Sequence, residues 1–195
     1  MNIGIDIDDT ISETYESFFT YAQKYILEDL KRNIEISDNG MIEHSYHYAD
    51  MTKLSQEENT QFLEKYLVPV FNETKPKALA DKYISKLQED GNKIIIITSR
   101  REKYRDLTQN WLKKYNINYD ILIMNCENKK EAIEENNIDI FIDDNLNFCK
   151  EALNNGRKVF MMDTRPNRNL ELPTNIKRVF SWAHFYNESR RYIWK

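Results

Sequence analysis

Four short apolar runs, rich in isoleucine or valine, restrict the fold of this chain more than any other feature. They span residues 2–7, 93–98, 138–142 and 158–162, and a fifth run at 119–124 is similar. Strands that are covered on both faces have this nearly continuous apolarity, and such strands belong to parallel sheets. The runs therefore predict a parallel sheet that is buried between two layers.

Helical patterns separate these runs. We expect helices over residues 76–90, 102–115, 129–137 and 146–154. In the first of them, Pro76 suits the first helical position and Gly91 suits the residue just after the end. Alternation of strands and helices predicts an α/β fold, in which a Rossmann-like parallel sheet is sandwiched by helices and the crossovers are right-handed.

The exception is the long interval between the first two runs. Residues 14–74 contain two helical patterns, at 14–31 and 55–67, and no strand-like run of comparable quality. An ordinary crossover needs only about a dozen residues. We therefore expect a small helical cap at 14–74, inserted after the first strand of an α/β core that comprises residues 1–13 and 75–195. Its many aromatic side chains suit a small core or the lining of a ligand pocket.

Polar residues follow three of the apolar runs directly. These residues are Asp6, Asp8, Asp9, Thr98, Ser99, Asp143 and Asp144. Ligands of open α/β sheets bind beyond the carboxyl ends of the strands, so the fold would bring these groups to one edge. Clustered carboxylates at a buried edge are costly unless a cation binds there. Because the nearby ligands are oxygen atoms alone, the natural cation is Mg²⁺.

The spacing of the first acids also suits phosphoryl chemistry. Asp6 and Asp8 would face the same way in a regular strand, so one could attack a substrate while the other handles a proton. Mg²⁺ would offset the charge between an anionic nucleophile and an anionic phosphoryl group. Hydroxyl and ammonium groups would hold the phosphoryl oxygens. The ammonium group could come from Lys129 or Lys130, which follow the run at 119–124.

Four segments resemble, in order, the motifs of the haloacid dehalogenase (HAD) superfamily. They are DIDDT at 6–10, IIIITS at 94–99, Lys129, and FIDD at 141–144. The order, separations and expected strands agree with that superfamily over about residues 1–165. The segment between the first two motifs takes the place of the superfamily's helical cap of the first type.

Within the superfamily, the chain most resembles the 5′(3′)-deoxyribonucleotidase-like nucleotidases. The paired acids and the pattern at residues 98–100 and 110–120 are similar to theirs. Two positions depart from the usual pattern. Asp9 stands where relatives often have Gly, and Arg100 stands where they often have Pro, which leaves the substrate open. Arg100 and its neighbour Arg101 suit either contact with a second anionic group of the substrate or full solvation.

The resemblance implies roles for the two acids of the first motif. Asp6 would be the nucleophile, becoming an aspartyl phosphate, and would also be a metal ligand. Asp8 would protonate the leaving oxygen and later deprotonate the hydrolytic water, with its backbone carbonyl on the metal. Such an acid needs a raised pKa; a neighbouring carboxylate favours this, whereas Mg²⁺ opposes it.

The resemblance also implies the remaining groups of the site. Thr98 and Ser99 would bind the phosphoryl group, and Lys129 would pair with both the nucleophile and the phosphate. Asp144 would be the third metal carboxylate, with Asp143 in support.

These expectations combine into a Mg²⁺-dependent phosphomonoester hydrolase, a phosphatase whose small phosphorylated substrate is a nucleotide. The cap would close over the substrate, and Tyr15, Phe18 and Tyr46 would stack on its base. One alternative is a phosphatase or phosphotransferase for another small phosphorylated metabolite. Another is a phospho-accepting signalling or binding module, although the lysine of such modules follows the last acids, whereas Lys129 precedes them.

Charge and composition limit the partners. The net charge is −4, which gives no footprint for nucleic-acid binding. No apolar run approaches membrane-spanning length, and the first residues lack the pattern of a signal peptide. The two cysteines, Cys126 and Cys149, lie far apart, so a reducing environment is the simpler assumption. We therefore expect a cytoplasmic protein.

Overall fold

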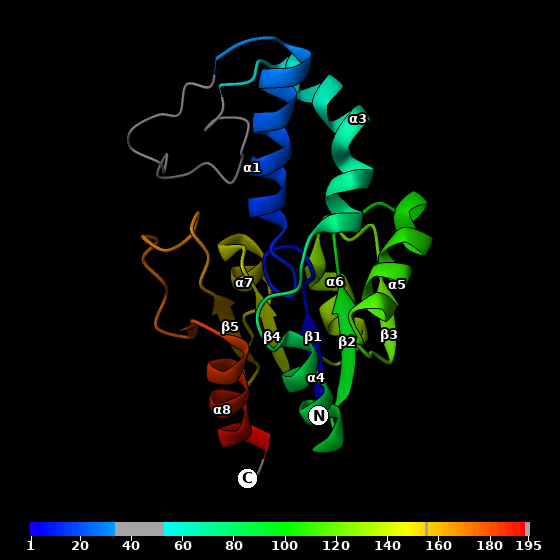
Figure 1. Cartoon of the computed structure of the whole chain (residues 1–195). Helices are drawn as coiled ribbons and strands as arrows, with labels where there is room; N and C mark the ends of the chain where they lie inside the picture. Colours follow the sequence, from blue (N-terminus) through cyan, green and yellow to red (C-terminus); the bar gives the residue numbers. More distant parts are fainter. Residues whose placement is uncertain (34–52, 155, 194–195) are drawn as a thin grey trace.

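The computed structural model describes residues 1–33, 53–154 and 156–193 and contains a parallel sheet at its centre (Figure 1). Its six strands lie in the order β3-β2-β1-β4-β5-β6, and every neighbouring pair is parallel. The strands are β1 (Asn2–Ile5), β2 (Lys93–Ile97), β3 (Ile121–Ile123), β4 (Ile140–Asp143), β5 (Lys158–Met162) and β6 (Ile176–Val179). The five strands that the sequence predicts are all present.

The strand order reverses beside β1. The chain runs from β1 outward through β2 to β3, and then returns to the other side of β1 with β4, β5 and β6. In the register, Ile5 is opposite Ile96 of β2 on one side and opposite Ile142 of β4 on the other. The switch point therefore lies between β1 and β4, the two strands that the acidic motifs follow.

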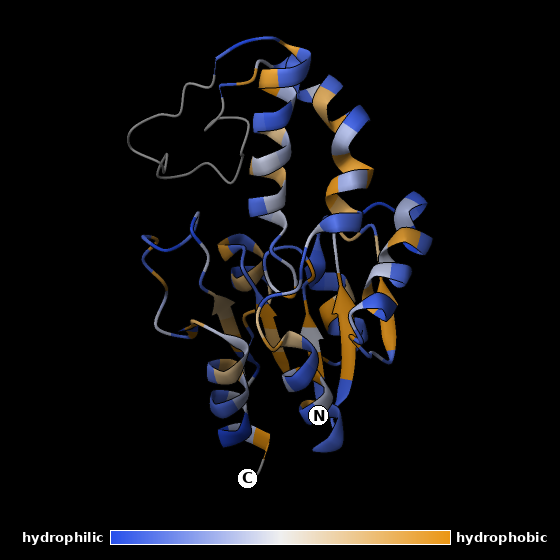
Figure 2. Ribbon diagram, viewed as in Figure 1, coloured by the Kyte–Doolittle hydropathy of each residue, from blue (hydrophilic) through white to orange (hydrophobic). Residues whose placement is uncertain are grey.

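Helices cover both faces of the sheet. On one face lie α4 (Ala80–Glu89), α5 (Arg105–Lys114) and α8 (Trp182–Ile193), whose buried side chains join Ile94 and Ile96 in one core cluster. On the other face, α6 (Lys129–Glu135) and α7 (Leu146–Glu151) join Ile95 and Ile97 in a second cluster. Figure 2 shows the apolar strands between helices that turn polar surfaces outward. The predicted sandwich of a parallel sheet between helices is therefore confirmed.

The inserted segment forms helices beyond the carboxyl edge of the sheet (Figure 1). Helix α1 (Thr14–Lys24) continues as a π-helix (Tyr25–Asp29) and packs against α3 (Gln56–Glu73). The two helices share an aromatic cluster that is separate from the sheet clusters and includes Tyr25, Phe62 and Tyr66. The division into a core and a cap at residues 14–74 stays a prediction.

The chain enters and leaves this helical segment side by side. Ser12 and Pro76 form an antiparallel bridge, and the amide N–H of Lys77 donates to the carbonyl of Ile11 at 2.7 Å. The predicted helix start at Pro76 is therefore wrong. Helix α4 begins at Ala80, because the preceding residues first pair with the outgoing chain.

Other boundaries also differ from the predictions. Helix α3 runs on to Glu73 with Pro69 inside it, beyond the predicted end at residue 67. A short 3₁₀ turn (Glu102–Tyr104) precedes α5. Strand β6 has no counterpart among the predicted runs, because Lys177 and Arg178 interrupt its apolar pattern at the edge of the sheet. In the described part of the chain, none of the helices is both long and apolar enough to cross a bilayer.

Candidate active site

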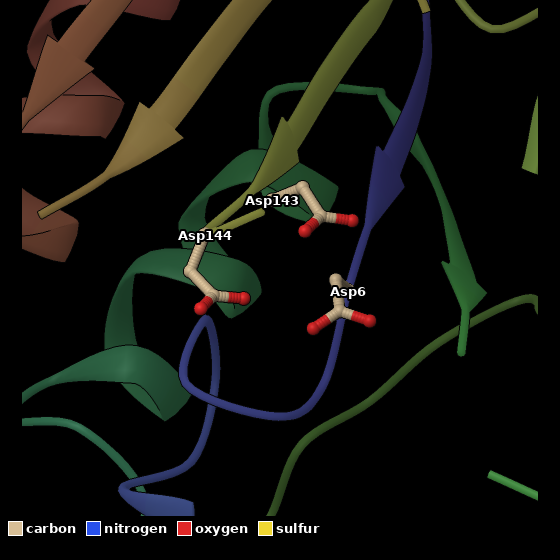
Figure 3. A group of neighbouring side chains, drawn as sticks. All are labelled: Asp6, Asp143 and Asp144. Atoms are coloured by element: carbon tan, nitrogen blue, oxygen red, sulfur yellow. The ribbon is translucent and has the colours of Figure 1, made fainter. Parts of the chain in front are cut away.

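The first acid of the site is placed by the strand that precedes it. The amide N–H of Asp6 donates to the carbonyl of Ile142 at 3.1 Å, so the backbone still pairs with β4 one residue beyond the end of β1. Asp143 closes β4. The two carboxylates therefore lie next to each other at the switch point, as Figure 3 shows together with Asp144.

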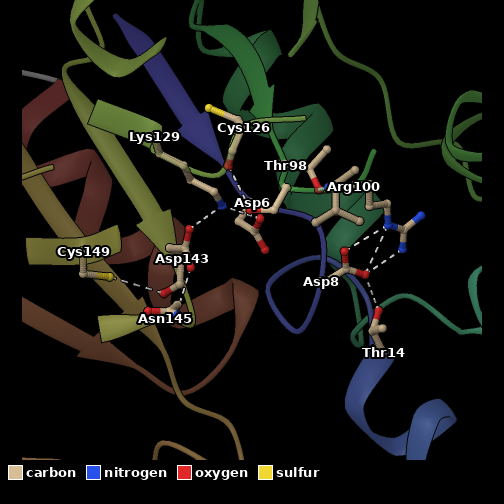
Figure 4. Close-up of polar contacts among 12 residues, drawn as sticks. Asp6, Asp8, Thr14, Thr98, Arg100, Cys126, Lys129, Asp143, Asn145 and Cys149 are labelled. Carbon is tan, nitrogen blue, oxygen red and sulfur yellow. Dashed lines mark hydrogen bonds and ion pairs between the residues drawn. The ribbon is translucent and has the colours of Figure 1, made fainter. Parts of the chain in front are cut away.

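A buried lysine joins these two acids. The Nζ atom of Lys129 lies 2.5 Å from Oδ1 of Asp6 and 2.7 Å from Oδ2 of Asp143 (Figure 4). The lysine side chain is only 1% exposed. It is the first residue of α6, whose N-cap residue Asn128 accepts a hydrogen bond from the amide of Lys130. Lys130, the alternative lysine, is exposed.

The ionisation of this group depends on burial and on the balance of charges. Burial lowers the pKa of Lys129, but the charges of Asp143 and Asp6 outweigh it, so the net pKa is raised and the lysine is cationic. Burial also raises the pKa of Asp6 to about 8, against the opposing effect of the lysine. Full ionisation of the three carboxylates Asp6, Asp143 and Asp144 against this one cation would leave a surplus of negative charge.

Asp144 is the third carboxyl group of this cluster. One carboxylate oxygen from each of Asp6, Asp143 and Asp144 lies within 4.8 Å of the others. Burial raises the pKa of Asp144 well above its ordinary value, and the charges of Asp9 and Asp143 raise it further. A compact set of oxygen donors with excess negative charge fits a hard divalent cation.

Asp8 has a different partner. The Nη2 atom of Arg100 lies 2.7 Å from its Oδ1, and Nε lies 3.0 Å from Oδ2 (Figure 4). The hydroxyl of Thr14 also donates to Oδ1 at 2.7 Å. Burial opposes ionisation, but the guanidinium and the hydrogen bonds outweigh it, so the pKa of Asp8 is lowered. The pKa of Asp8 is thus shifted in the direction opposite to the one that a general acid needs.

Arg100 is the site residue that the sequence left most open. It is 4% exposed, and its Cζ atom lies 4.0 Å from the centre of the Phe71 ring of α3. Full solvation, one of the two interpretations of Arg100, is therefore wrong. The sequence evidence for a special role of Arg100 was its position directly after Ser99, where similar nucleotidases often have Pro. The sequence does not show that the partner of Arg100 is Asp8.

The two hydroxyl residues after β2 are placed differently. Thr98 is fully buried, and its Oγ1 accepts the amide N–H of Arg100 at 3.2 Å. Ser99 is exposed, and its hydroxyl donates to the carbonyl of Cys126 at 2.9 Å. Ser99 lines the cavity of about 220 Å³ that also contains Asp6 and Asp8. Of the two, Ser99 is the one that reaches the open space of the site.

Comparisons with known proteins show which family the chain belongs to. A family model described as "Protein of unknown function (DUF2608)" matches residues 3–140. The chain is 32% identical to a nucleotidase of Clostridium acetobutylicum over 187 residues, which are 95% of this chain and 92% of the relative. It is 31% identical to the YqfW protein of Bacillus subtilis, over 93% of this chain and 90% of that protein.

A solved structure shows the same fold. A HAD family hydrolase of Deinococcus radiodurans, with bound phosphate and sodium, has a TM-score of 0.70 at 10% identity and covers 98% of this chain and 96% of its own. The chain belongs to the family of the matching model and to that of the clostridial nucleotidase, and it has the fold of a HAD family hydrolase. The recognition from four motifs is therefore confirmed, as is the prediction of an enzyme of the phosphatase class.

The departure of this chain from the usual Gly at residue 9 has a local reason. Asp9 has a φ angle of 58°, in the left-handed region, which Asp tolerates better than most residues. Its Oδ1 accepts the amide N–H of Tyr15 in the first turn of α1 at 2.9 Å. Burial raises the pKa of Asp9 to about 7, against this hydrogen bond. The Asp9 side chain thus binds the first turn of α1, while its backbone keeps the left-handed conformation that Gly would adopt at this position.

The aromatic side chains that were expected to meet a base have different surroundings. Tyr15 lines the site cavity. Phe18 packs within the helical segment, with its ring centre 6.3 Å from that of Phe62 and 6.2 Å from that of Phe71. Tyr46 lies outside the described residues. Stacking by any of the three stays a prediction.

Asn167 supports the acidic loop and was not expected from the sequence. It is fully buried, and its Nδ2 donates to the carbonyls of Asp144 and Met162, both at 2.8 Å. It therefore ties the loop that carries Asp144 to the loop after β5. No motif identifies this residue, since its role arises from two loops that meet only in the folded sheet.

Proposed function

We propose that this HAD phosphatase is a Mg²⁺-dependent nucleotidase that works through an aspartyl phosphate on Asp6. The observation that carries the proposal is the pairing of the Asp6 carboxylate with the buried Lys129, beside two further acids and at the mouth of a small cavity. The name of the clostridial relative, which is a nucleotidase, supports a nucleotide as the substrate.

The acidic cluster would hold the metal. Asp6, Asp143 and Asp144 offer closely spaced oxygen ligands of the kind that Mg²⁺ prefers, and Lys129 neutralises only part of their charge. Asn167 would keep the Asp144 loop in place for this purpose. When bound, Mg²⁺ supplies positive charge that reduces repulsion between an anionic nucleophile and an anionic phosphoryl group.

Asp6 would perform the covalent chemistry. A carboxylate oxygen attacks phosphorus, and the bond from phosphorus to the leaving oxygen breaks with its electron pair on that oxygen. Lys129 would hold the nucleophile in position and offer charge to the phosphoryl oxygens, with the Ser99 hydroxyl as a partner in the cavity, while Thr98 would hold the loop through the amide of Arg100. Water then attacks phosphorus, the bond to Asp6 breaks, and inorganic phosphate leaves.

Asp8 would handle the protons of both steps. In the first step it gives a proton to the leaving oxygen, and in the second it takes one from the attacking water. Because Arg100 lowers its pKa, Asp8 is a carboxylate before substrate binds, the form that the second step needs. The first step requires Asp8 to take up a proton before or as the substrate binds.

The helical segment at residues 14–74 would act as the cap. Tyr15 already lines the site cavity, and the paired chain crossings at Ser12 and Pro76 connect the segment to the core. Movement about these crossings would admit the substrate and then exclude water from the aspartyl phosphate.

Phosphate release tests the proposal. The purified protein is supplied with 5′- and 3′-nucleoside monophosphates and with non-nucleotide phosphomonoesters, with Mg²⁺ or with a chelator. We expect Mg²⁺-dependent hydrolysis of nucleotides and a loss of roughly 1,000-fold or more in Asp6→Asn, because the nucleophile is gone. Asp106→Asn, which changes an exposed acid on α5, is the matched control.

Two results would contradict parts of the proposal. Full activity of Asp6→Asn would contradict an aspartyl-phosphate intermediate. If the intermediate forms, mass spectrometry of acid-quenched Asp8→Asn protein should detect one added phosphoryl group. Hydrolysis of the non-nucleotide esters alone would support the phosphatase activity and contradict a nucleotide as the substrate.

A further inference from the structure

A second, larger cavity adjoins the site. It has a volume of about 700 Å³ and lies between α3 and the segment at residues 99–104, whereas the site cavity has about 220 Å³. Pockets that enclose a whole small-molecule ligand usually have 300–1,000 Å³. The site cavity therefore suits a phosphoryl group, and the rest of the substrate must extend beyond it. Ser99 lines both cavities and so marks where they meet.

The larger cavity has an apolar wall and a cationic wall. Leu67, Val68 and Phe71 of α3 form part of the first, and Val68 is 48% exposed. Arg101 and Lys103 contribute to the second; both are exposed, and neither forms an ion pair within residues 1–33, 53–154 and 156–193.

The charge of this lining is unbalanced. Among the described residues that line the cavity, Glu64 is the acidic one, against the two unpaired cations. A protein of net charge −4 thus presents a local positive surface beside its phosphoryl site. Such a surface attracts an anionic group of the ligand.

Arg100 connects the two cavities. It lines the larger one, while its guanidinium binds Asp8 of the site. Its Nη1 atom is buried and has no hydrogen-bond partner within the described part of the chain. Because Asp8 would protonate the leaving oxygen, the leaving group has to lie on the side of Asp8, and therefore toward Arg100 and this cavity.

We propose that this cavity receives the leaving group of the substrate and that the leaving group carries a second phosphate. The preferred substrate class is then a nucleoside bisphosphate, with one phosphate at Asp6 and the other against Arg101 and Lys103, while the apolar wall contacts the nucleoside. The inference rests on the proposed function and specifies its substrate. Only the phosphate at Asp6 is released.

Relative specificity tests the inference. The ratio of kcat/KM for a nucleoside 3′,5′-bisphosphate to that for the matching monophosphates is measured in the wild type and in the double variant Arg101→Gln/Lys103→Gln. Hydrogen bonds to charged groups contribute about 1.5–3 kcal/mol, so we expect a wild-type ratio of roughly 10 or more that falls toward 1 in the double variant. Lys113→Gln/Lys114→Gln, at the exposed far end of α5, should keep the wild-type ratio.

Binding gives a second measurement that needs no turnover. In the Asp6→Asn protein with Mg²⁺, calorimetry should show roughly tenfold tighter binding of the bisphosphate than of the monophosphates. Equal affinities, a wild-type ratio near 1, or an unchanged ratio in the double variant would each overturn the inference while nucleotide hydrolysis stands. Absence of nucleotide hydrolysis by the wild type would instead overturn the proposed function, and the inference with it.

Discussion

The two acids of the first motif, Asp6 and Asp8, are two positions apart, yet the fold shifts their pKa values in opposite directions. Asp6 shares one buried lysine with Asp143, and burial raises its pKa to about 8. Asp8 pairs with Arg100, which contacts neither Asp6 nor Asp143, and the pKa of Asp8 is lowered. Once its carboxyl groups ionise, the first side would have a surplus of negative charge that a metal ion can offset, whereas the charges of Asp8 and Arg100 are nearly balanced. The pKa values of two neighbouring carboxyl groups thus differ because different cations contact them.

Replacing the shared lysine should have the largest effect. In Lys129→Met, Asp6 and Asp143 lose their cation in a buried place. Removal of one partner of a buried ion pair costs about 3–5 kcal/mol, and the loss of the phosphate-binding charge should also lower kcat/KM by roughly 1,000-fold. Urea unfolding and phosphate release measure the two effects.

Lys130→Met is the matched control, since the neighbouring lysine is exposed. We expect its stability to stay within about 0.5 kcal/mol of the wild type. Equal effects of the two substitutions would contradict the assignment of the ammonium group to Lys129.

Replacing the arginine should have a smaller effect on stability. In Arg100→Gln, Asp8 loses its main partner, but its side chain is 31% exposed, so water restores part of the solvation. We expect a loss of roughly 1–3 kcal/mol in unfolding free energy. The upper edge of the pH profile of kcat/KM should move to higher pH, because kcat/KM reports the first step, in which Asp8 gives a proton, and loss of the guanidinium raises the pKa of Asp8.

Arg105→Gln is the control for charge alone, because Arg105 pairs with Glu102 at the surface. Arg100→Lys should restore only part of the effect, since a lysine cannot reproduce the two-atom contact with a carboxylate. An unshifted pH profile in Arg100→Gln would show that Arg100 does not control the ionisation of Asp8.

The sequence allowed the fold and the acidic edge to be predicted, because both depend on local patterns. Continuous apolar runs predicted five buried strands, and motif order brought Asp6, Lys129 and Asp144 to one edge. The start of α4 was missed because Pro76 bridges Ser12, which lies on a distant segment. Long-range partners of this kind leave no periodic signal in the sequence.

The same limit applies to the site. Whether Arg100 is solvated depends on Phe71, which lies on the inserted helix α3 and covers the guanidinium. Asn167 acts through the backbone carbonyl of Asp144, which any residue would offer. The motifs thus predict which groups take part in the chemistry, but the pKa values of these groups are set by neighbours that only the fold brings together.

Magnesium should stabilise the acidic side in a pH-dependent way. Without metal, the pKa of Asp6 rises from 3.8 to about 8, and the pKa of Asp144 is also raised. The folded state then holds protons that the unfolded state has released, so the stability from these groups falls as pH rises from about 4 to 8. Metal binding requires the carboxylates without protons.

The rise in melting temperature that Mg²⁺ produces should therefore be larger at pH 8 than at pH 6. At a metal concentration 100 times the Kd, the stabilisation is about 2.7 kcal/mol, or roughly 5–10 °C for a chain of this size. In Asp144→Asn we expect a much smaller shift at both pH values. A shift in the wild type that is equal at pH 6 and pH 8 would contradict the raised pKa values.

The smallest effect concerns the second partner of Asp8. The Thr14 hydroxyl donates to Oδ1 of Asp8 at 2.7 Å and lies 2.6 Å from the hydroxyl of Ser12. Thr14→Val keeps the shape and removes these hydrogen bonds, so we expect a loss of about 1 kcal/mol and a few-fold decrease in kcat/KM. Thr20→Val is matched to it, since the Thr20 hydroxyl is on the same helix and donates to a backbone carbonyl at the surface. If Thr14→Val shifted the pH profile as much as Arg100→Gln does, the hydroxyl rather than the guanidinium would hold Asp8 ionised. The difference between Asp6 and Asp8 would then depend on a hydrogen bond instead of on charge.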